Sequence, residues 1–361
     1  AIGYQSAQIL TSGIGSTAIG YQSLFTATDN DYNTAVGSRA LYSISGSSGT
    51  EGEANTAVGR YAGYSTTTGG WNVFIGQNAG YGNTTGIYNN FIGAGAGQNS
   101  TTANQNTYIG WYAAYYQQVG GNNVAIGHQT LYGASGKANS ATQNVVIGYQ
   151  AGYRAEAGYG ITAVGDRAFR NISASGSLST AIGYAAGFYA SGSNNTFVGA
   201  QAGYGGTTSA PYSSGQYNVA IGAQTLQNFT TAGYNVVVGY NSGNDITTGG
   251  QNTILGYDAG DVITTGMSNV LVGYAAGGNL ATDSSQNVII GESAGAQGSV
   301  ALDGTVLIGR LAGYSINSSA ADGTIAIGYQ AGTNITSGAR QTFIGYQAGY
   351  STTTGQENVF I

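Results

Sequence analysis

Residues able to do acid–base, nucleophilic or metal chemistry are few and scattered in this chain of 361 residues. His128 is its one histidine, and cysteine is absent. The histidine directly follows a recurrent glycine, at a position that holds tyrosine in nine other places and Trp111, Arg60, Asp166 or Glu292 elsewhere. A position that accepts all these side chains is typical of a solvent-facing surface. We therefore expect His128, Arg60, Asp166 and Glu292 to be exposed, and we expect no catalytic or metal-binding role for the histidine.

Paired carboxylates are the other candidates, because two carboxyl groups can share acid–base work or hold calcium. The pairs are Asp29/Asp31, Glu51/Glu53 and Asp258/Asp261. Acid–base catalysis needs a positioned group of shifted pKa in a pocket, which a narrow repeat array does not offer. Calcium-binding β-roll repeats need an aspartate in each coil, so only the first pair is a calcium candidate. The glycine-rich strings at 93–97 and 203–206 lack the P-loop lysine. The sequence thus predicts a protein that is not an enzyme and has no cofactor or metal site.

The composition indicates a folded chain with little charge. Lys and Arg together number 8, Asp and Glu number 14, and the net charge is −6. Lys137 is the single lysine, whereas nucleic-acid binding needs clustered Lys and Arg to displace counterions, so we expect no nucleic-acid partner. The longest apolar stretches run to four or five residues, so we expect no membrane insertion. Hydrophobic residues make up 41% of the chain, far more than disordered chains carry.

A repeat runs through the whole sequence. A glycine preceded by Ile, Val or Leu recurs from Gly3 to Gly345, and eleven of the nineteen spacings are 17 residues. Such repeats are typical of solenoids, in which each coil buries its apolar side against its neighbours. β-Branched residues bounded by Gly, Asn and Thr-Gly indicate strand–turn–strand coils. The sequence predicts an all-β, rod-shaped β-solenoid or β-roll of about twenty 17-residue repeats, one continuous array over residues 1–361.

Columns of equivalent residues predict the interior. The residue before the recurrent glycine is aliphatic in all twenty copies. This column is the expected core, represented by Ile126, Ile147, Val238, Ile290 and Ile344. The residue three positions after the glycine is always Ala, Ser or Thr, which indicates close approach of backbones. The recurrent glycines are expected to supply positive φ angles at the corners of the coil.

Two further columns predict ladders along the stack. Asn stands four residues before the glycine in thirteen copies, and stacked Asn side chains can hydrogen-bond to each other. Tyrosine occupies the first and the fifth positions after the glycine nine times each. Stacked aromatic pairs stabilise sheets by about 0.2–1 kcal/mol each. The alternative interpretation of the tyrosines is a sticky or sugar-binding aromatic face.

Three longer spacings predict insertion loops at 44–54, 133–143 and 205–216, the last of which contains Pro211. Insertions in a solenoid collect on one edge, which is often the recognition edge, but a tolerant turn also accumulates insertions without function. The Ser and Thr turns are expected to be exposed on every coil, so O-linked glycans are a possible modification.

The motifs resemble a known family. The segments NTAVG (33–37), NVAIG (123–127), STAIGYAAG (179–187) and TFIGYQAGY (342–350) resemble the head repeats of trimeric autotransporter adhesins, and similar repeats occur in phage tail-fibre shafts. The resemblance implies a left-handed parallel β-roll with the aliphatic-Gly motif on the inner strand and three associated chains. It also implies inner-core positions for Ile126, Ile147 and Ile344 and corner positions for Gly127, Gly148 and Gly345.

We therefore expect a structural protein that forms an extracellular, cell-surface or virion fibre and self-associates as a filament or homotrimer. The alternative is an adhesin head module that binds a receptor or glycan, which an insertion loop folded over a concave patch would favour. An ice-binding solenoid would need a regular Thr array, which is interrupted at 97–101, 154–158 and 295–299. Because the repeat pattern runs to both ends, we also expect a segment of a longer fibre without capping repeats.

Overall fold

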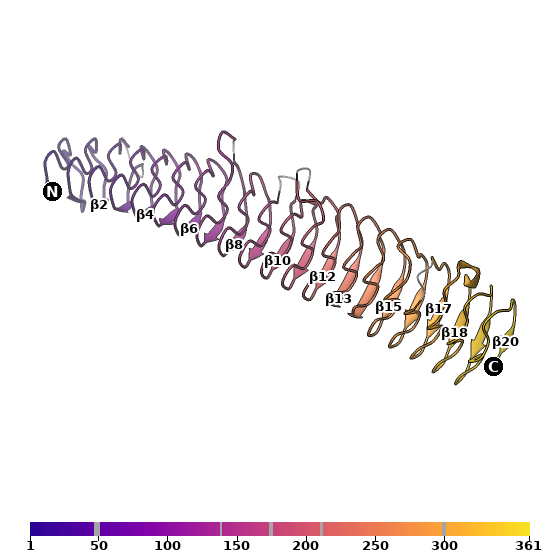
Figure 1. Ribbon diagram of the computed structural model, residues 1–361. Coiled ribbons are helices and arrows are strands. Elements are labelled where there is room, and N and C mark those ends of the chain that lie inside the picture. Colours follow the sequence, from indigo (N-terminus) through magenta and orange to yellow (C-terminus); the bar gives the residue numbers. More distant parts are fainter. Residues whose placement is uncertain (47–50, 138, 173–175, 210–211, 298–300) are drawn as a thin grey trace. The chain divides into compact units, whose positions relative to one another are not determined.

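The chain folds into stacked coils joined by parallel strands. The computed structural model describes residues 1–46, 51–137, 139–172, 176–209, 212–297 and 301–361. These form two compact units, residues 1–178 and 179–361, and each unit is a stack of coils (Figure 1). The predicted all-β solenoid is confirmed. Of the expected insertion loops, residues 47–50, 138 and 210–211 lie outside the described residues.

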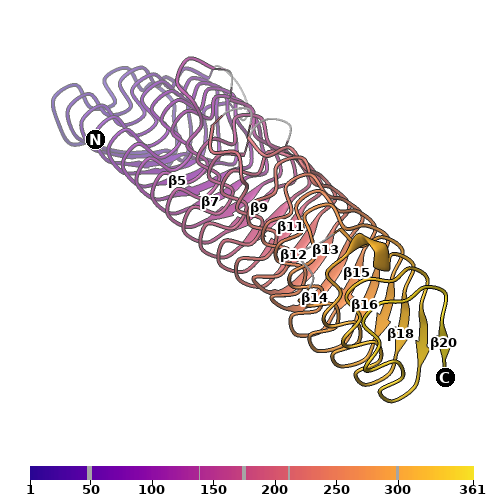
Figure 2. The same cartoon turned by 45° about the vertical axis from the view of Figure 1, so that its right-hand side comes forward.

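The first unit contains one short strand per coil. Each strand pairs in parallel with the next at identical repeat positions, as in Thr107↔Val124 and Ile109↔Ile126. Figure 2 shows the strands side by side along one side of the coils. The strands are β1 (Thr17–Ile19), β2 (Thr34–Val36), β3 (Thr56–Val58), β4 (Val73–Ile75), β5 (Asn90–Ile92), β6 (Thr107–Ile109), β7 (Val124–Ile126), β8 (Val145–Ile147) and β9 (Thr162–Val164).

The second unit repeats this arrangement. It adds a single 3₁₀ turn, η1 (Ser319–Ala321), within the coil that follows β17. Its strands are β10 (Thr180–Ile182), β11 (Thr196–Val198), β12 (Val219–Ile221), β13 (Val236–Tyr240), β14 (Thr253–Tyr257), β15 (Val270–Val272), β16 (Val288–Ile290), β17 (Val306–Ile308), β18 (Ile325–Ile327), β19 (Thr342–Ile344) and β20 (Val359–Phe360).

The expected second strand of each coil is a run of turns instead. Beyond the recurrent glycine, alternate residues have left-handed backbone, as in Gln129 (φ 53°) and Leu131 (φ 49°), and a strand cannot contain them. Their amides still bond between coils: Gln129 N donates to the Trp111 carbonyl at 2.9 Å, and Leu131 N donates to the Ala151 carbonyl at 3.0 Å. The coils are therefore hydrogen-bonded on this side too, in both directions.

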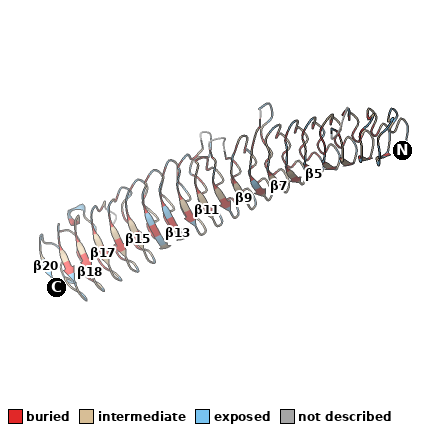
Figure 3. Cartoon of the chain, turned by 180° about the vertical axis from the view of Figure 1, so that it is seen from behind, coloured by how far each residue is buried: buried red, intermediate tan, exposed pale blue. Residues whose placement is uncertain are grey.

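The column predicted to form the core lies on the outer side of the sheet instead. Ile126, Ile147, Val238 and Ile290 are only partly buried, and Ile344 is 39% exposed. The buried residue is the one before each of them, the second residue of its strand and the centre of the three-residue strands. Figure 3 shows red, buried segments in strands that are otherwise tan or pale blue. Side chains alternate between the two faces of a strand, so residues one and three before the glycine share a face. That face is the outer one. The fully buried second residues are Ala125, Val146, Val237, Ile289 and Phe343.

The corner glycines are confirmed. Gly127, Gly148 and Gly345 have φ angles of 132°, 133° and 134°. A Cβ atom on Gly127 would lie 2.5 Å from the carbonyl oxygen of Gly148 in the next coil. The recurrent glycine thus serves two needs at once, a backbone conformation that L residues rarely adopt and a direct backbone contact between coils.

Candidate association surface

His128 belongs to an aromatic column and not to a reactive centre. Its ring lies between those of Trp111 and Tyr149, at centroid distances of 4.8 and 5.2 Å. These rings cover the imidazole, so His128 is partly buried and the prediction of full exposure is wrong for it; Asp166 and the other two predicted residues are exposed. Among the described residues, no group of three His, Cys, Asp or Glu side chains could hold a metal ion.

The calcium candidate forms contacts between coils. Asp29 Oδ1 accepts hydrogen bonds from Thr11 Oγ1 at 2.9 Å and from Ser12 Oγ at 2.6 Å. The bond from Ser12, followed by that from Thr11, lowers the pKa of Asp29. Asp31 Oδ1 accepts the Ile14 amide at 2.6 Å. Both carboxylates therefore tie their own coil to the preceding one.

Asp261 carries the most perturbed carboxyl group. Burial, and after it the charge of Asp258, raises the pKa of Asp261 to about 6. Asp245 adds further like charge, and its own Oδ1 accepts a hydrogen bond from Asn228 Nδ2 at 2.9 Å. A shifted pKa is common at catalytic sites. Here the shift is caused by burial and by the neighbouring carboxylates. The same two causes would raise the pKa of a carboxyl group that has no catalytic role.

One of the two residue columns on the outer side of the sheet is aliphatic in both units, and the other holds mostly Val or Thr. We use "outer face" for the strand residues one and three positions before the recurrent glycine. In the first unit Ile75 is 38% exposed and Val145 is 40% exposed, and in the second unit Ile221 is 40% exposed and Leu255 is 47% exposed. Aliphatic side chains that recur at the same place on every coil give a continuous apolar strip. Large exposed apolar patches mark interaction surfaces.

Exposed tyrosines border the outer face. The first position after the glycine adjoins the aliphatic column, and its rings stack from coil to coil. Tyr240, Tyr257 and Tyr274 stack at centroid distances of 5.2 and 5.3 Å, and Tyr329 stacks on Tyr346 at 5.3 Å. These stacks confirm the predicted ladder and widen the apolar strip.

The fifth-position column forms a second tyrosine ladder in residues 1–178. One run is Phe25, Tyr42, Tyr64 and Tyr81, with adjacent rings 5.0–5.1 Å apart. The other run is Tyr115, Tyr132 and Tyr153, at 5.5 and 4.9 Å, with the Arg170 guanidinium 5.1 Å from the last ring. The ring faces are thus covered by one another. The ladder presents ring edges and hydroxyls, which does not suit stacking of sugars on ring faces.

A ladder of buried asparagines runs through each unit, as predicted. From the second Asn of each ladder onward, each Asn donates its side-chain Nδ2 and its backbone N–H to the Oδ1 of the Asn in the preceding coil. For Asn106 and Asn123 these distances are 2.9 Å from Nδ2 and 3.0 Å from the amide. The first unit uses Asn33, Asn55, Asn72, Asn89, Asn106, Asn123 and Asn144. The second uses Asn195, Asn218, Asn235, Asn252, Asn269 and Asn287.

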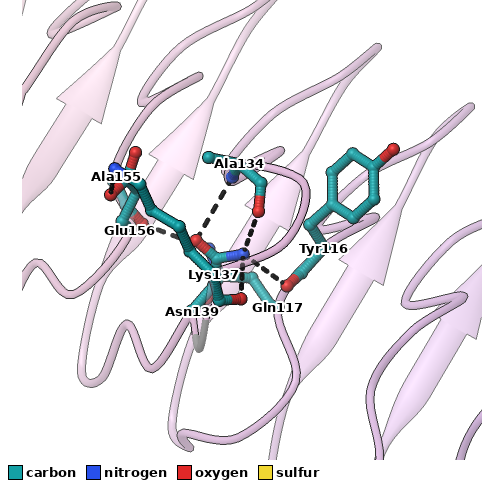
Figure 4. Close-up of polar contacts among 7 residues, drawn as sticks. All are labelled: Tyr116, Gln117, Ala134, Lys137, Asn139, Ala155 and Glu156. Atoms are coloured by element: carbon teal, nitrogen blue, oxygen red, sulfur yellow. Dashed lines mark hydrogen bonds and ion pairs between the residues drawn. The ribbon is translucent and has the colours of Figure 1, made fainter.

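The insertion loop at 133–143 is fixed by buried polar side chains (Figure 4). Asn139 is fully buried, and its Nδ2 donates to the carbonyls of Tyr116 and Ala134, both at 2.8 Å. Gln117 is also fully buried; its Oε1 accepts the Ala141 amide at 3.2 Å, and its Nε2 donates to the Ala155 carbonyl at 3.1 Å. A buried amide costs free energy unless it is hydrogen-bonded, so these contacts favour one arrangement of the described loop residues, 133–137 and 139–143.

The fixed loop borders a shallow cleft of about 420 Å³. Lys137 Nζ bonds Glu156 Oε2 across it at 2.7 Å. Burial, and then the neighbouring Tyr116 and Tyr153, raises the pKa of Tyr132 to about 12, so this phenol stays protonated. The adhesin alternative predicts an insertion loop folded over a concave patch, and residues of this loop line the cleft. Its residues are Tyr116, Tyr132, Gly133, Ala134, Ser135, Lys137, Tyr153, Arg154 and Glu156.

Both tyrosine ladders and the Asn ladder follow from the repeat pattern, whereas the aliphatic column of the outer face was predicted to be the core. The cleft was not predicted, because Gln117 and Asn139 show no repeat signal. No family model matches the chain, and no curated protein matches it. No helix in the described parts of the chain is long and apolar enough to cross a membrane.

Proposed function

We propose that this chain is part of a structural fibre outside a cell or on a virion, and that copies of it associate along the outer face. The observation that carries the proposal is the aliphatic strip, in which Ile75 of the first unit and Ile344 of the second are exposed and the equivalent residues of the other coils are at least partly exposed. Completing the burial of one such side chain contributes about 1 kcal/mol. Repeated over successive coils, this contribution favours a stable assembly.

The period of the strip favours a second copy as the partner. Apolar residues recur once per coil, at the roughly 4.8 Å spacing of neighbouring strands. A partner that matches every level must have the same spacing, which an identical chain in parallel register provides. The resemblance of NVAIG (123–127) and related segments to trimeric adhesin heads supports three chains and a location on a surface.

Adding charge to the outer face should separate the chains. We expect the double variant Ile126→Asp with Ile147→Asp to lower the mass measured by light scattering to that of one chain, 36.3 kDa. The reason is that carboxylates buried between chains would cost several kcal/mol. Far-UV circular dichroism should be unchanged, because these side chains point away from the core.

The matched control is Ser135→Asp, which adds a carboxylate at an exposed residue of the insertion loop. The assembly should retain its mass in this variant. A wild-type mass of 36.3 kDa at micromolar concentration would refute association, as would an Ile126→Asp/Ile147→Asp variant that keeps the wild-type mass.

The cleft at the 133–143 loop favours a second candidate function, the binding of a short anionic saccharide. Its volume of about 420 Å³ lies within the roughly 300–1,000 Å³ range of small-molecule sites. Two cationic side chains, Lys137 and Arg154, face one carboxylate there, in a chain whose net charge is −6. Tyrosine hydroxyls next to cationic groups suit a ligand with hydroxyl and carboxylate groups.

Sialyllactose and lactose are suitable probes, since they differ by one acidic sugar. We expect calorimetry to detect sialyllactose binding that is stronger than lactose binding, and Lys137→Gln to weaken it about tenfold by removing a charge-assisted hydrogen bond. Equal binding of the two sugars, or an unchanged affinity in the Lys137→Gln variant, would exclude the cleft as an anionic-saccharide site.

A further inference from the structure

The fifth-position ladder places phenol rings of successive coils face to face. Tyr42 and Tyr64 have centroids 5.1 Å apart and ring planes inclined by 12°, and Tyr64 and Tyr81 are 5.0 Å apart and inclined by 4°. Tyr132 and Tyr153 are 4.9 Å apart and inclined by 3°. Tyr64 also has an edge-on neighbour, Tyr61, at 5.4 Å and 88°. Stacked and perpendicular pairs therefore occur at nearly the same distance around one ring.

Stacked phenols have the geometry that radical coupling requires. The unpaired electron of a tyrosyl radical is in the ring π system, with density on the carbons ortho to the oxygen. Its lobes project perpendicular to the ring, so two parallel stacked rings direct them at each other. A perpendicular neighbour such as Tyr61 presents a ring edge instead.

We propose that these stacked tyrosines are modification sites at which a one-electron oxidant joins consecutive coils by dityrosine bonds. Each phenol loses one electron to the oxidant and one proton to water. The two radicals form a carbon–carbon bond between ortho carbons. The two hydrogens on those carbons then leave as protons while the two oxygens regain protons. In total, two tyrosines lose two electrons and two protons, and one peroxide or persulfate molecule accepts the electrons.

The composition and burial of the chain favour this reaction. Cysteine is absent, and the chain has one methionine and two tryptophans, so few side chains compete with its 29 tyrosines for the oxidant. Tyr42, Tyr64, Tyr132 and Tyr153 are partly buried, which leaves their edges within reach of a small oxidant. Each bond would close a loop of about one repeat, a covalent link in a chain that cannot form disulfides. The inference goes beyond the proposed fibre function and concerns contacts within one chain.

The test uses the folded, full chain with a photo-oxidised ruthenium–bipyridyl complex and persulfate. Trypsin separates the partners, because Tyr42 is the single tyrosine of peptide 40–60 while Tyr64 lies in 61–137. We expect a crosslinked 40–60/61–137 product with dityrosine fluorescence. Tyr64→Phe retains a ring but lacks the phenol, and should reduce this product at least tenfold. Tyr61→Phe, which alters the perpendicular neighbour, should leave it unchanged. Circular dichroism checks that both variants are folded.

Isotope labelling separates links within a chain from links between chains. A mixture of unlabelled and ¹⁵N-labelled chains should give products whose two peptides carry the same label. Products that carry mixed labels in random proportion, loss of the product in Tyr61→Phe with persistence in Tyr64→Phe, or absence of dityrosine after oxidation would each overturn the proposal. None of these results depends on whether the chains form a fibre.

Discussion

Replacing Gly127 with alanine should destabilise the first unit by about 3–5 kcal/mol, the sum of backbone strain and a steric clash. The glycine has a φ angle of 132°, in a region that is essentially restricted to glycine. Its added Cβ would lie 2.5 Å from the Gly148 carbonyl oxygen, a backbone atom fixed by the next coil. The urea concentration at the unfolding midpoint, measured at one protein concentration, should fall accordingly.

Gly136→Ala is the matched control. Gly136 also has a positive φ angle, 75°, but no atom lies within 4 Å of the position of its Cβ. The Gly136→Ala variant should lose only about 1–2 kcal/mol of its free energy of unfolding, which is the cost of placing alanine in a left-handed conformation. If both variants shift the midpoint equally, the direct contact of glycine backbones between coils is not a source of stability.

Replacing Asn106 with alanine should cost about 4 kcal/mol, because it breaks the buried Asn ladder in the middle. Asn106 Oδ1 accepts both the backbone amide and Nδ2 of Asn123, and its own Nδ2 donates to Asn89 Oδ1 at 3.2 Å and to the Gly120 carbonyl at 3.3 Å. Alanine leaves several of these groups buried without a partner, each at about 1–3 kcal/mol, less what water recovers. Urea unfolding monitored by circular dichroism measures the loss.

Asn106→Ser provides the graded comparison. Serine already occupies this repeat position at Ser16, where its Oγ accepts the Asn33 amide at 3.1 Å. The serine variant should therefore recover about half of the stability that alanine loses, because one of the two bonds to the following coil is retained. Equal losses for serine and alanine would show that the backbone amide bond contributes nothing measurable.

Much of the fold follows from the sequence period. The recurrent glycine marks every coil, the small residue and the Asn keep fixed offsets from it, and each has the predicted place in the structure. The facing of the strand did not follow, because a period of two shows which residues share a face but not which face is inward. A column that is always aliphatic is expected in a core, but the same pattern also occurs on an apolar outer face.

A second pattern in the sequence could have identified the inner face. Large side chains at the strand centre coincide with glycine four positions after the recurrent glycine: a Cβ on Gly97 would lie 2.6 Å from the Phe91 ring. In five of the eight strands whose centre is alanine, the later position is large, as for Ala163 and Phe169, both fully buried; Ala57, Ala181 and Ala326 are followed by glycine there. Such compensation of volume is expected only between residues that share one interior. The outer column shows no comparable exchange.

The left-handed turns and the loop cleft could not be predicted from the sequence, for a different reason. Residues such as Gln129 and Leu131 adopt positive φ angles without being glycine, so composition does not signal them. The conformation follows from hydrogen bonds to both neighbouring coils. The hydrogen bonds that Gln117 and Asn139 make to the insertion loop and the neighbouring coils likewise join residues far apart in the sequence, which no local pattern predicts.

The Asn ladder of the first unit has an electrical direction. From Asn55 to Asn144, every side-chain amide donates one N–H to the Asn of the preceding coil and directs its oxygen toward the following coil. Aligned amide dipoles polarise one another, so each bond strengthens the next. A coil added in the reverse orientation would bring oxygen against oxygen or N–H against N–H. Growth of such a stack is therefore vectorial: its two directions are chemically distinct, and only head-to-tail addition continues the row of dipoles.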